Sequence, residues 1–361
     1  MLSYIYDYGF NIYINSILNT IILKNKIQVV KRFIMTGKSA GIYRNILQRL
    51  NIIKPIISKN IINSSISILK KNKYMKPSNT PYNFNEWLVG LVDGDGCFHV
   101  YINNEGTKIS FKLKIVQSVY NEKLIHYIKK ELGVGNINKS GGMINYEITN
   151  KKNIKEIILP IFDNYKLLSS KRFNYLKFKE CILIMDNENL SRELKIDLIK
   201  FIKKIDIPKN YKSDAFNGLN IRDIKSEDDV NKIVSKSWLS GFIEAEGSFN
   251  LVVKDKKMKR IVHGFGISQK LDLILLYSIK YIFHIKSNIC YKEKHNYYLL
   301  DTTNSKNIEI IINYLITDDY STYLKGIKSF EFSLWRRSYL KYKGDYNRLI
   351  EIREFIRNKK K

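Results

Sequence analysis

Cysteine and histidine are both scarce in this chain of 361 residues. The three cysteines, Cys97, Cys181 and Cys290, are far apart and form no C-x-x-C pair, so a disulfide framework and a cysteine-rich zinc site are excluded. The five histidines form no zinc signature either. We therefore expect a protein of a reducing compartment that uses neither disulfides nor zinc.

Acidic residues are also few. The chain has 34 Asp and Glu against 62 Lys and Arg, which gives a formal net charge of +28. Such a charge attracts a polyanion strongly and in a salt-dependent manner. DNA, ribosomal RNA and an acidic membrane surface would each satisfy this charge, so charge alone does not choose the partner.

The first 80 residues contain a single acid, Asp7, and thirteen lysines or arginines. Asp7, Asn11, Asn15 and Asn19 interrupt their most apolar part, which excludes a membrane span there. An acid-poor, basic start is typical of an organellar import signal, but an extension translated inside the organelle has the same composition. Heavy use of Lys, Asn, Ile and Tyr indicates AT-rich coding and favours an organelle-encoded protein, in the mitochondrion first and the chloroplast second.

An internal repeat is the most informative feature. Residues 87–100 read WLVGLVDGDGCFHV and residues 238–251 read WLSGFIEAEGSFNL, with the same Trp-Leu-x-Gly opening, two acids, a glycine and an aromatic residue. The spacing of the apolar residues predicts a helix in each copy, and the run after the glycine predicts a strand. We expect Gly96 to end its helix in the left-handed conformation.

Small residues lie four apart on both predicted helices, Gly90 and Gly94 in the first copy and Gly241 and Ala245 in the second. This spacing lets two helix backbones approach closely. If the helices pack in parallel, Asp95 and Glu246 lie side by side at the negative ends of both helix dipoles, where acids are unfavourable. A cation is then required, and hard carboxylate oxygens favour Mg²⁺, with Mn²⁺ as the alternative ion.

Both stretches resemble the motif of the LAGLIDADG homing endonucleases in their single-chain form with two motifs. Corresponding glutamines follow, Gln117 twenty-two residues after Asp95 and Gln269 twenty-three after Glu246. The order of predicted elements also agrees twice, so the resemblance covers roughly residues 81–350. It implies an α+β fold of two pseudo-symmetric αββαββα repeats, packed through the motif helices, with curved antiparallel sheets forming a DNA-binding saddle.

The resemblance also implies roles for individual residues. Asp95 and Glu246 would bind the metal, together with the backbone carbonyls of Gly94 and Ala245. Gln117 and Gln269 would position the water that delivers the nucleophile, although reading a base is an equal alternative for each. A basic residue is expected near each metal cluster, either Lys171 or Arg172 in the first half and either Lys325 or Lys328 in the second, and we choose Lys171 and Lys328. Asp93 and Glu244 are expected to cap the interface or to bond the partner helix.

The expected DNA contacts lie on the predicted second strand of the first repeat and in a hairpin of the second repeat. In the first half Ile109, Phe111, Leu113 and Ile115 alternate with polar residues, which predicts a sheet with one buried and one basic face. Paired faces of this kind can lie along the major groove. The expected DNA-binding residues are Ser110, Lys112 and Lys114 in the first half, and Lys254, Lys256, Lys257 and Arg260 in a hairpin of the second.

The sequence therefore predicts four segments: a basic N-terminal extension of unknown role at 1–80, a first repeat at 81–205, a linker at 206–235, and a second repeat with a basic tail at 236–361. The resulting hypothesis is a monomeric, metal-dependent, site-specific double-strand DNA endonuclease that promotes intron mobility and does not bind a membrane. The alternative is an RNA-binding maturase that assists splicing of its own host intron, with or without DNA cleavage. Retention of both acids favours the nuclease.

Overall fold

The computed structural model describes residues 82–103, 105–106, 108–317 and 321–358. The predicted basic extension at 1–80 lies outside these residues. The segment Pro81–Lys361 forms one compact unit. Within the described ranges, no helix is both long enough and apolar enough to cross a membrane.

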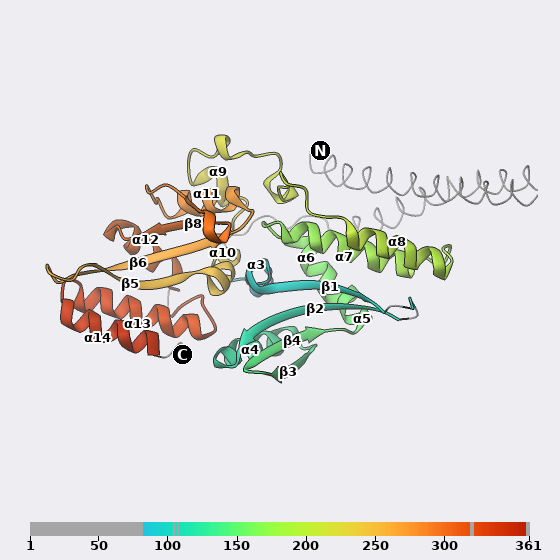
Figure 1. Ribbon diagram of the computed structural model, residues 1–361, viewed down its shortest axis with the longest axis horizontal. Coiled ribbons are helices and arrows are strands. Elements are labelled where there is room, and N and C mark those ends of the chain that lie inside the picture. Colours follow the sequence, from blue (N-terminus) through green and yellow to red (C-terminus); the bar gives the residue numbers. More distant parts are fainter. Residues whose placement is uncertain (1–81, 104, 107, 318–320, 359–361) are drawn as a thin grey trace, which may run out of the picture. The chain divides into compact units, whose positions relative to one another are not determined.

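The first half begins with α3 (Phe84–Asp95) and contains a four-stranded antiparallel sheet in the spatial order β1-β2-β4-β3 (Figure 1). Its strands are β1 (Gly96–Ile102), β2 (Ile109–Ser118), β3 (Asn136–Ser140) and β4 (Met143–Ile148). The helix between the two hairpins is α4 (Glu122–Leu132), which Gly133 ends at a φ of 70°.

The single closing helix expected for this half is instead a series of helices: α5 (Lys151–Asn153), a π-turn at Ile154–Ile158, α6 (Leu159–Asn164), α7 (Lys171–Asp186) and α8 (Arg192–Lys204). The π-turn ends two residues before Pro160, which has no N–H to continue the ordinary helical hydrogen bonds. Pro160 therefore lies in the first turn of α6, and residues 165–170 separate α6 from α7, which has its own N-terminus.

The second half repeats the plan. It begins with α10 (Lys236–Glu246) and has a sheet in the order β5-β6-β8-β7. The strands are β5 (Ser248–Asp255), β6 (Arg260–Gln269), β7 (Cys290–Lys292) and β8 (Tyr297–Thr302), and the helices are α11 (Leu273–Ile282), α12 (Ser305–Leu315), α13 (Ile327–Tyr342) and α14 (Tyr346–Asn358). Between the halves, residues 206–235 contain α9 (Asp228–Asn231) and short 3₁₀ turns. The predicted pair of repeats is confirmed.

In the part of the chain that the structure describes, helices cover one face of each sheet and leave the other face open. In the first half the ring of Phe98 on β1 packs against Phe162 of α6 and Tyr175 of α7. In the second half Phe249 on β5 packs against Phe332 and Trp335 of α13. The polar residues that alternate with these aromatics consequently lie on the uncovered face of each sheet.

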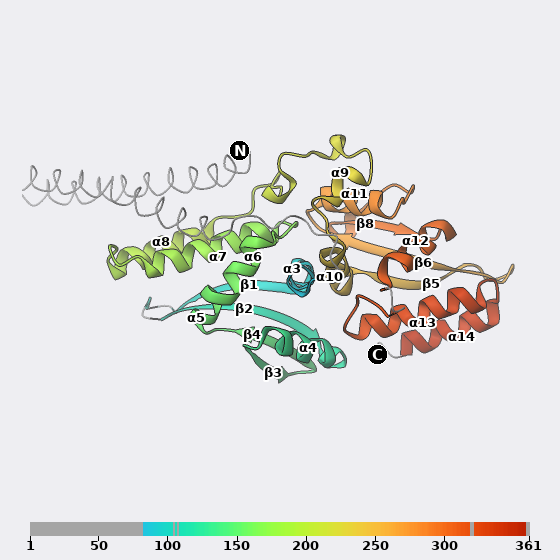
Figure 2. The ribbon, with the colours of Figure 1, turned by 180° about the vertical axis from the view of Figure 1, so that it is seen from behind.

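The motif helices α3 and α10 lie between the two sheets in both views (Figures 1 and 2). A Cβ atom added to Gly90 would lie 1.9 Å from the carbonyl oxygen of Trp238, and one added to Gly241 would lie 1.9 Å from that of Trp87. At the next turn, a Cβ on Gly94 would lie 2.2 Å from the Cβ of Ala245. The backbones touch in a pseudo-symmetric, parallel arrangement, so the C-terminal ends of the two helices meet.

The expectation that Gly96 ends α3 in the left-handed conformation is wrong. Its φ is −84° and its ψ is 157°, an extended conformation, and Gly247 after α10 is likewise extended. Glycine is required here for space, because a Cβ on Gly96 would lie 2.4 Å from Val92 Cγ1 and one on Gly247 would lie 2.5 Å from Ile243 Cγ2. The strand can therefore turn away immediately after the acid.

The first acid of each motif is buried and binds the backbone at the start of a later helix. Asp93 accepts hydrogen bonds from the N–H groups of Leu168 and Ser169 at 2.6 and 3.1 Å, just before α7. It also accepts one from Trp238 Nε1 of the partner helix at 3.1 Å. Glu244 accepts from the N–H groups of Lys325 and Gly326 at 2.6 and 3.2 Å, just before α13.

Burial outweighs these hydrogen bonds in both acids. It raises the pKa of Asp93 to about 6 and the pKa of Glu244 to about 7. Because α7 and α13 follow directly, these two acids fix where the N-termini of both helices lie. They connect the motif helices to the rest of each half.

Substitution of Gly90 tests the helix contact. The sequence alone suggests that Gly90→Leu disrupts the interface while Gly90→Ala is milder, but the Cβ itself would meet a backbone carbonyl at 1.9 Å. We expect Gly90→Ala already to cost about 1–3 kcal/mol through overpacking, and Gly90→Leu more. Chemical denaturation measures both, and Gly266→Ala is the matched control because its nearest neighbour would lie at 3.7 Å. Equal stability of Gly90→Ala and wild type would disprove the backbone contact.

Asp93→Asn tests the buried acid. The amide keeps one acceptor oxygen for donors from Leu168, Ser169 and Trp238, so buried N–H groups lose their partners at a cost of about 1–3 kcal/mol. Asp197→Asn, at an exposed position on α8, should have no effect.

The effect of Asp93→Asn should also depend on pH. The pKa of Asp93 in the folded state lies above its ordinary value, so the stabilising contribution of the Asp93 carboxyl is complete below pH 3.8 and is lost as the pH rises to about 6. The deficit of Asp93→Asn in urea unfolding should therefore shrink over that range, and a deficit that grows would contradict the assignment.

Candidate active site

Two carboxylates lie at the junction of the motif helices. Asp95 is the last residue of α3 and Glu246 is the last residue of α10. Burial raises the pKa of both carboxyls, and the charge of Asp95 raises that of Glu246 further. Two like charges at the negative ends of two helix dipoles require positive charge nearby.

Two lysines supply part of that charge. Lys171, the first residue of α7, donates from Nζ to the carbonyl oxygens of Gly94 and of Val92, the latter at 3.0 Å. Lys328, the second residue of α13, donates to the carbonyl oxygen of Gly247 at 2.7 Å. Burial lowers the pKa of Lys171, although the neighbouring Asp93, Asp95 and Glu246 act in the opposite direction. Both ammonium groups thus lie against the C-terminal ends of the motif helices.

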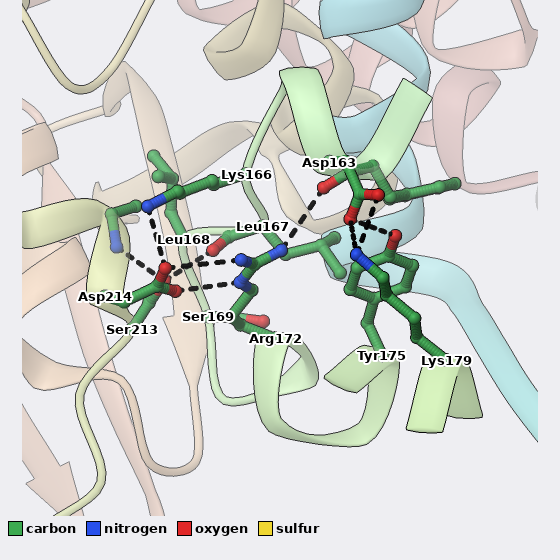
Figure 3. A network of polar contacts seen from close by, with 12 residues as sticks. Asp163, Lys166, Leu167, Leu168, Ser169, Arg172, Tyr175, Lys179, Ser213 and Asp214 are labelled. Atoms are coloured by element: carbon green, nitrogen blue, oxygen red, sulfur yellow. Dashed lines mark hydrogen bonds and ion pairs between the residues drawn. The ribbon is translucent and has the colours of Figure 1, made fainter. Parts of the chain in front are cut away.

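The other two basic candidates from the sequence have different partners. The guanidinium of Arg172 binds Asp214, with Nε to Oδ1 at 2.8 Å (Figure 3). The ammonium of Lys325 lies 4.3 Å from the centre of the Tyr82 ring. The geometry therefore favours Lys171 and Lys328 as the residues beside the carboxylates.

The segment between the halves is attached at the start of α7 (Figure 3). Ser213 Oγ donates to the carbonyl of Leu167 at 2.6 Å, and Asp214 pairs with Lys166 at 2.8 Å as well as with Arg172. Burial alone would raise the pKa of Asp214, but the two cations outweigh it and lower that pKa. This segment therefore helps to hold the helix that carries Lys171.

The two predicted glutamines lie near the ends of β2 and β6, but their surroundings differ. Gln117 donates from Nε2 to Asp95 Oδ2 at 2.6 Å. Gln269 lines a cavity of about 330 Å³ together with Gly94, Lys171 and Glu246. Gln117 is hydrogen-bonded to Asp95, whereas Gln269 faces an open space beside Glu246.

Each glutamine lies close to the lysine helix of the other half. Asn121, four residues after Gln117, accepts a hydrogen bond from the N–H of Ile327 at the start of α13, at 2.8 Å. Asp272, three residues after Gln269, accepts from the N–H of Ser170 just before α7, at 2.7 Å. The structure therefore brings Gln117 toward Lys328 and Gln269 toward Lys171, so each candidate catalytic set contains residues of both halves.

Sequence reasoning missed Asn121, Asp272 and Asp214. The first two stand at the start of the helices that follow the glutamines, at nearly equal distances from them. An alignment of the two repeats could have singled them out as polar residues in matching places. Asp214 gave no such signal, because the linker has no repeated counterpart.

The donor set is compatible with a hard divalent cation. Asp95 and Glu246 offer carboxylate oxygens, and Gly94 and Ala245 precede them with backbone carbonyls, although Lys171 already donates to that of Gly94. Among the described residues, no group of three or more His, Cys, Asp and Glu side chains could hold a metal. A site here would therefore depend on these two carboxylates and on oxygens of the backbone and water.

The predicted DNA-binding residues occupy two different settings. Lys112 and Lys114 lie on the open face of β2, in register with His99 and Cys97 of β1 and next to Ser110. Both lysines pair with Glu147 of β4, at 2.9 and 3.5 Å. In the second half the basic residues Lys254, Lys256, Lys257 and Arg260 are exposed at the end of the β5–β6 hairpin.

Comparison with known proteins gives consistent results. The sequence profile described as LAGLIDADG endonuclease matches residues 88–182 and 239–339, which make up more than half of the chain. The probable intron-encoded endonuclease Cox1-I1b of Schizosaccharomyces pombe is 33% identical over 305 residues, covering 80% of this chain and 72% of that protein. The uncharacterized mitochondrial protein RF1 of Saccharomyces cerevisiae is 30% identical over 227 residues, covering 62% of this chain and 43% of that protein.

Among solved structures, I-SmaMI bound to an uncleaved DNA target in the presence of calcium ions aligns with a TM-score of 0.59 at 22% identity, covering 76% of this chain and 98% of that chain. I-SmaMI bound to cleaved DNA gives the same TM-score and identity, with 97% of that chain covered. This likeness establishes the shared fold. Since the family profile spans both motifs and a relative shares a third of its residues over most of its length, the chain belongs to the LAGLIDADG endonuclease family.

Proposed function

We propose that this chain is a site-specific homing endonuclease that hydrolyses one phosphodiester on each strand of a long, asymmetric DNA site and so promotes intron mobility. The observation that carries the proposal is the pair Asp95 and Glu246 at the touching ends of two helices, each beside a half-buried lysine. Binding to RNA alone would not require this pair. The names of the relatives and the DNA complexes of I-SmaMI support the same activity.

Mg²⁺ is the proposed cofactor, with Mn²⁺ as the alternative, held by Asp95, Glu246 and the carbonyls of Gly94 and Ala245. A bound divalent ion lowers the pKa of water and neutralises charge at the scissile phosphate. Burial raises the pKa of both Asp95 and Glu246, and the charge of Asp95 raises that of Glu246 further. This supports the role, because a bound cation would favour the charged form of both carboxyls. The calcium ions present with I-SmaMI support a hard divalent cation at this fold.

The protein's own groups would complete the centre. The ammonium groups of Lys171 and Lys328 lie where negative charge develops on a phosphate placed beside the carboxylates. The amide of Gln117 is bound to Asp95 and can still offer a second N–H to a water molecule. Gln269 faces the cavity beside Glu246 and Lys171, which leaves room for such a water.

The proposed partner is double-stranded DNA, bound by a monomer whose two halves present different open faces. The first carries the charged residues Lys112, Lys114 and Glu147. On the second, Gly264 and Gly266 lie in a hollow that is also lined by Ser248, Asn250 and Asp301. Unequal faces favour an asymmetric target. The relative RF1 is described as mitochondrial, and the amino-acid composition of this chain is typical of AT-rich coding. Both observations support a mitochondrial, organelle-encoded protein.

Neutralising either carboxylate tests the reaction. Asp95→Asn and Glu246→Gln should each lower the cleavage rate by about a hundredfold or more in Mg²⁺ while DNA affinity is largely kept, because phosphate contacts lie elsewhere. The substrate is DNA that spans the uninterrupted insertion site of the host gene, and EDTA should abolish cutting by wild type. Asp197→Asn is the control. Intact wild type that binds this DNA without cutting it in Mg²⁺ or Mn²⁺, yet promotes splicing of its intron RNA, would replace the proposal with the maturase alternative.

The paired charges on β2 and β4 give a second test. Replacing Lys112 and Lys114 with glutamine should weaken DNA binding and flatten its salt dependence by about one unit of slope per lost phosphate contact. Glu147→Gln should do the opposite, because it removes the carboxylate that both lysines now share. Lys200→Gln, exposed on α8, serves as the control. Salt slopes that are the same in all these variants would mean that this face does not contact DNA.

A further inference from the structure

Three hydrogen bonds connect the second half to the first carboxylate. The N–H of Ile327 on α13 donates to Asn121 Oδ1 at 2.8 Å. Asn121 Nδ2 donates to Gln117 Oε1 at 2.9 Å, and Gln117 Nε2 donates to Asp95 Oδ2 at 2.6 Å. Every donor in this series faces an acceptor, so the helix that carries Lys328 is connected to the candidate metal ligand Asp95.

Asn121 is not explained by its place at the start of α4. It occupies the N-cap position, but its side chain makes no capping hydrogen bond to that helix. It is only 6% exposed, and both ends of its amide bind groups outside α4. A buried amide directed entirely at other elements indicates a role in joining them.

The chemistry of the amide fixes which way Gln117 points. Asn121 has one acceptor, which the Ile327 N–H uses, so its Nδ2 is left to face Gln117. Gln117 must therefore present Oε1 to Asn121 and Nε2 to Asp95. A flipped Gln117 would place an NH₂ group against an NH₂ group and a carbonyl oxygen against a carboxylate.

The other half has a different residue in the matching place. Asp272 stands at the N-cap of α11, also without a capping bond to its own helix. Both of its oxygens are directed at Ser170, with Oδ1 accepting from N at 2.7 Å and Oδ2 from Oγ at 3.1 Å. Asp272 thus holds the lysine helix of the first half, as Asn121 holds that of the second, but neither oxygen is directed at Gln269.

We propose that Asn121 is a positioning residue that orients the Gln117 amide against Asp95 and ties this orientation to the helix carrying Lys328. The proposal rests on the proposed endonuclease function. Its consequence is that the set containing Gln117 and Lys328 is prearranged for reaction, whereas the set containing Gln269 and Lys171 is not. The two DNA strands are then cut at different rates, and the faster strand is the one served by Gln117.

The test is Asn121→Asp, which keeps an acceptor for the Ile327 N–H but removes the donor to Gln117. End-labelled strands of one duplex report the two cleavage rates separately, and Gln117→Ala identifies the strand that Gln117 serves. Asn121→Asp should slow that same strand by about tenfold to a hundredfold and leave the other unchanged. In a Gln117→Ala background the added effect of Asn121→Asp should fall below about twofold, because Asn121 acts through Gln117.

Asp272→Asn is the matched control, since it makes the reverse exchange at the matching position and keeps an oxygen for the Ser170 N–H. It should leave the strand served by Gln117 at the wild-type rate. Equal slowing of both strands by Asn121→Asp, or an undiminished effect in the Gln117→Ala background, would overturn the proposal and leave Asn121 a purely structural residue.

A second measurement does not depend on cleavage. In protein labelled with ¹⁵N at glutamine side chains, the Gln117 NH₂ signal, identified by its loss in Gln117→Ala, should be protected from hydrogen exchange in wild type. Its exchange should become at least about tenfold faster in Asn121→Asp, because the amide is no longer held at both ends. Unchanged exchange would refute the orienting role whether or not the protein cuts DNA. A wild type that is inactive but shows the protected signal would refute only the endonuclease function.

Discussion

The contact between the backbones of α3 and α10 is the constraint on which the rest of the structure depends. Two glycines, Gly90 and Gly241, each lie against a tryptophan carbonyl of the opposite helix, so the helix axes come as close as backbone atoms allow. This closeness places Asp95 beside Glu246. It also ends both helices at one place, where the chain turns immediately into β1 and β5. The sheets, and hence their open faces, are therefore oriented by the same contact.

Each motif contains two acids, and they act at different levels. Asp93 and Glu244 are buried, and they bind backbone N–H groups at the starts of α7 and α13. Asp95 and Glu246 lie two residues further along each motif helix, at the junction. Asp95 is hydrogen-bonded to Gln117, and Glu246 lines the same cavity as Gln269. Asp93 and Glu244 determine where α7 and α13 begin, and these helices carry Lys171 and Lys328. The lysines then reach the carbonyls beside the second pair, so the geometry of the centre depends on acids that do not belong to it.

Much of this organisation could be predicted from one sequence. The internal repeat predicted the two halves, and the small residues predicted the contact between the motif helices. The alternation of apolar and polar residues in β2 predicted the buried and open faces of the sheet. The conformation of Gly96 was misjudged, because a glycine that ends a helix in the left-handed region and one that avoids a neighbouring side chain look the same in sequence. The separation of α7 from α6 was missed because residues 165–170, which lie between them, contain neither proline nor glycine.

The polar contacts between the halves could not be predicted in the same way. Asn121 and Ile327 are 206 residues apart, and Asp272 and Ser170 are 102 apart. No local pattern relates residues at such separations, and ordinary N-capping would have explained both polar side chains adequately. In the folded protein neither side chain caps its own helix.

The exchange of hydrogen bonds between halves limits how such a chain can be recombined. A chimera that joins the first half of one relative to the second half of another would inherit Asn121 from one parent and the start of α13 from the other. Matching α3 to α10 would then restore the helix contact but not the alignment of Gln117 with Lys328. The pairs Asn121–Ile327 and Ser170–Asp272 are among the contacts outside the motifs that join the two halves, and their residues would have to be transferred as matched pairs.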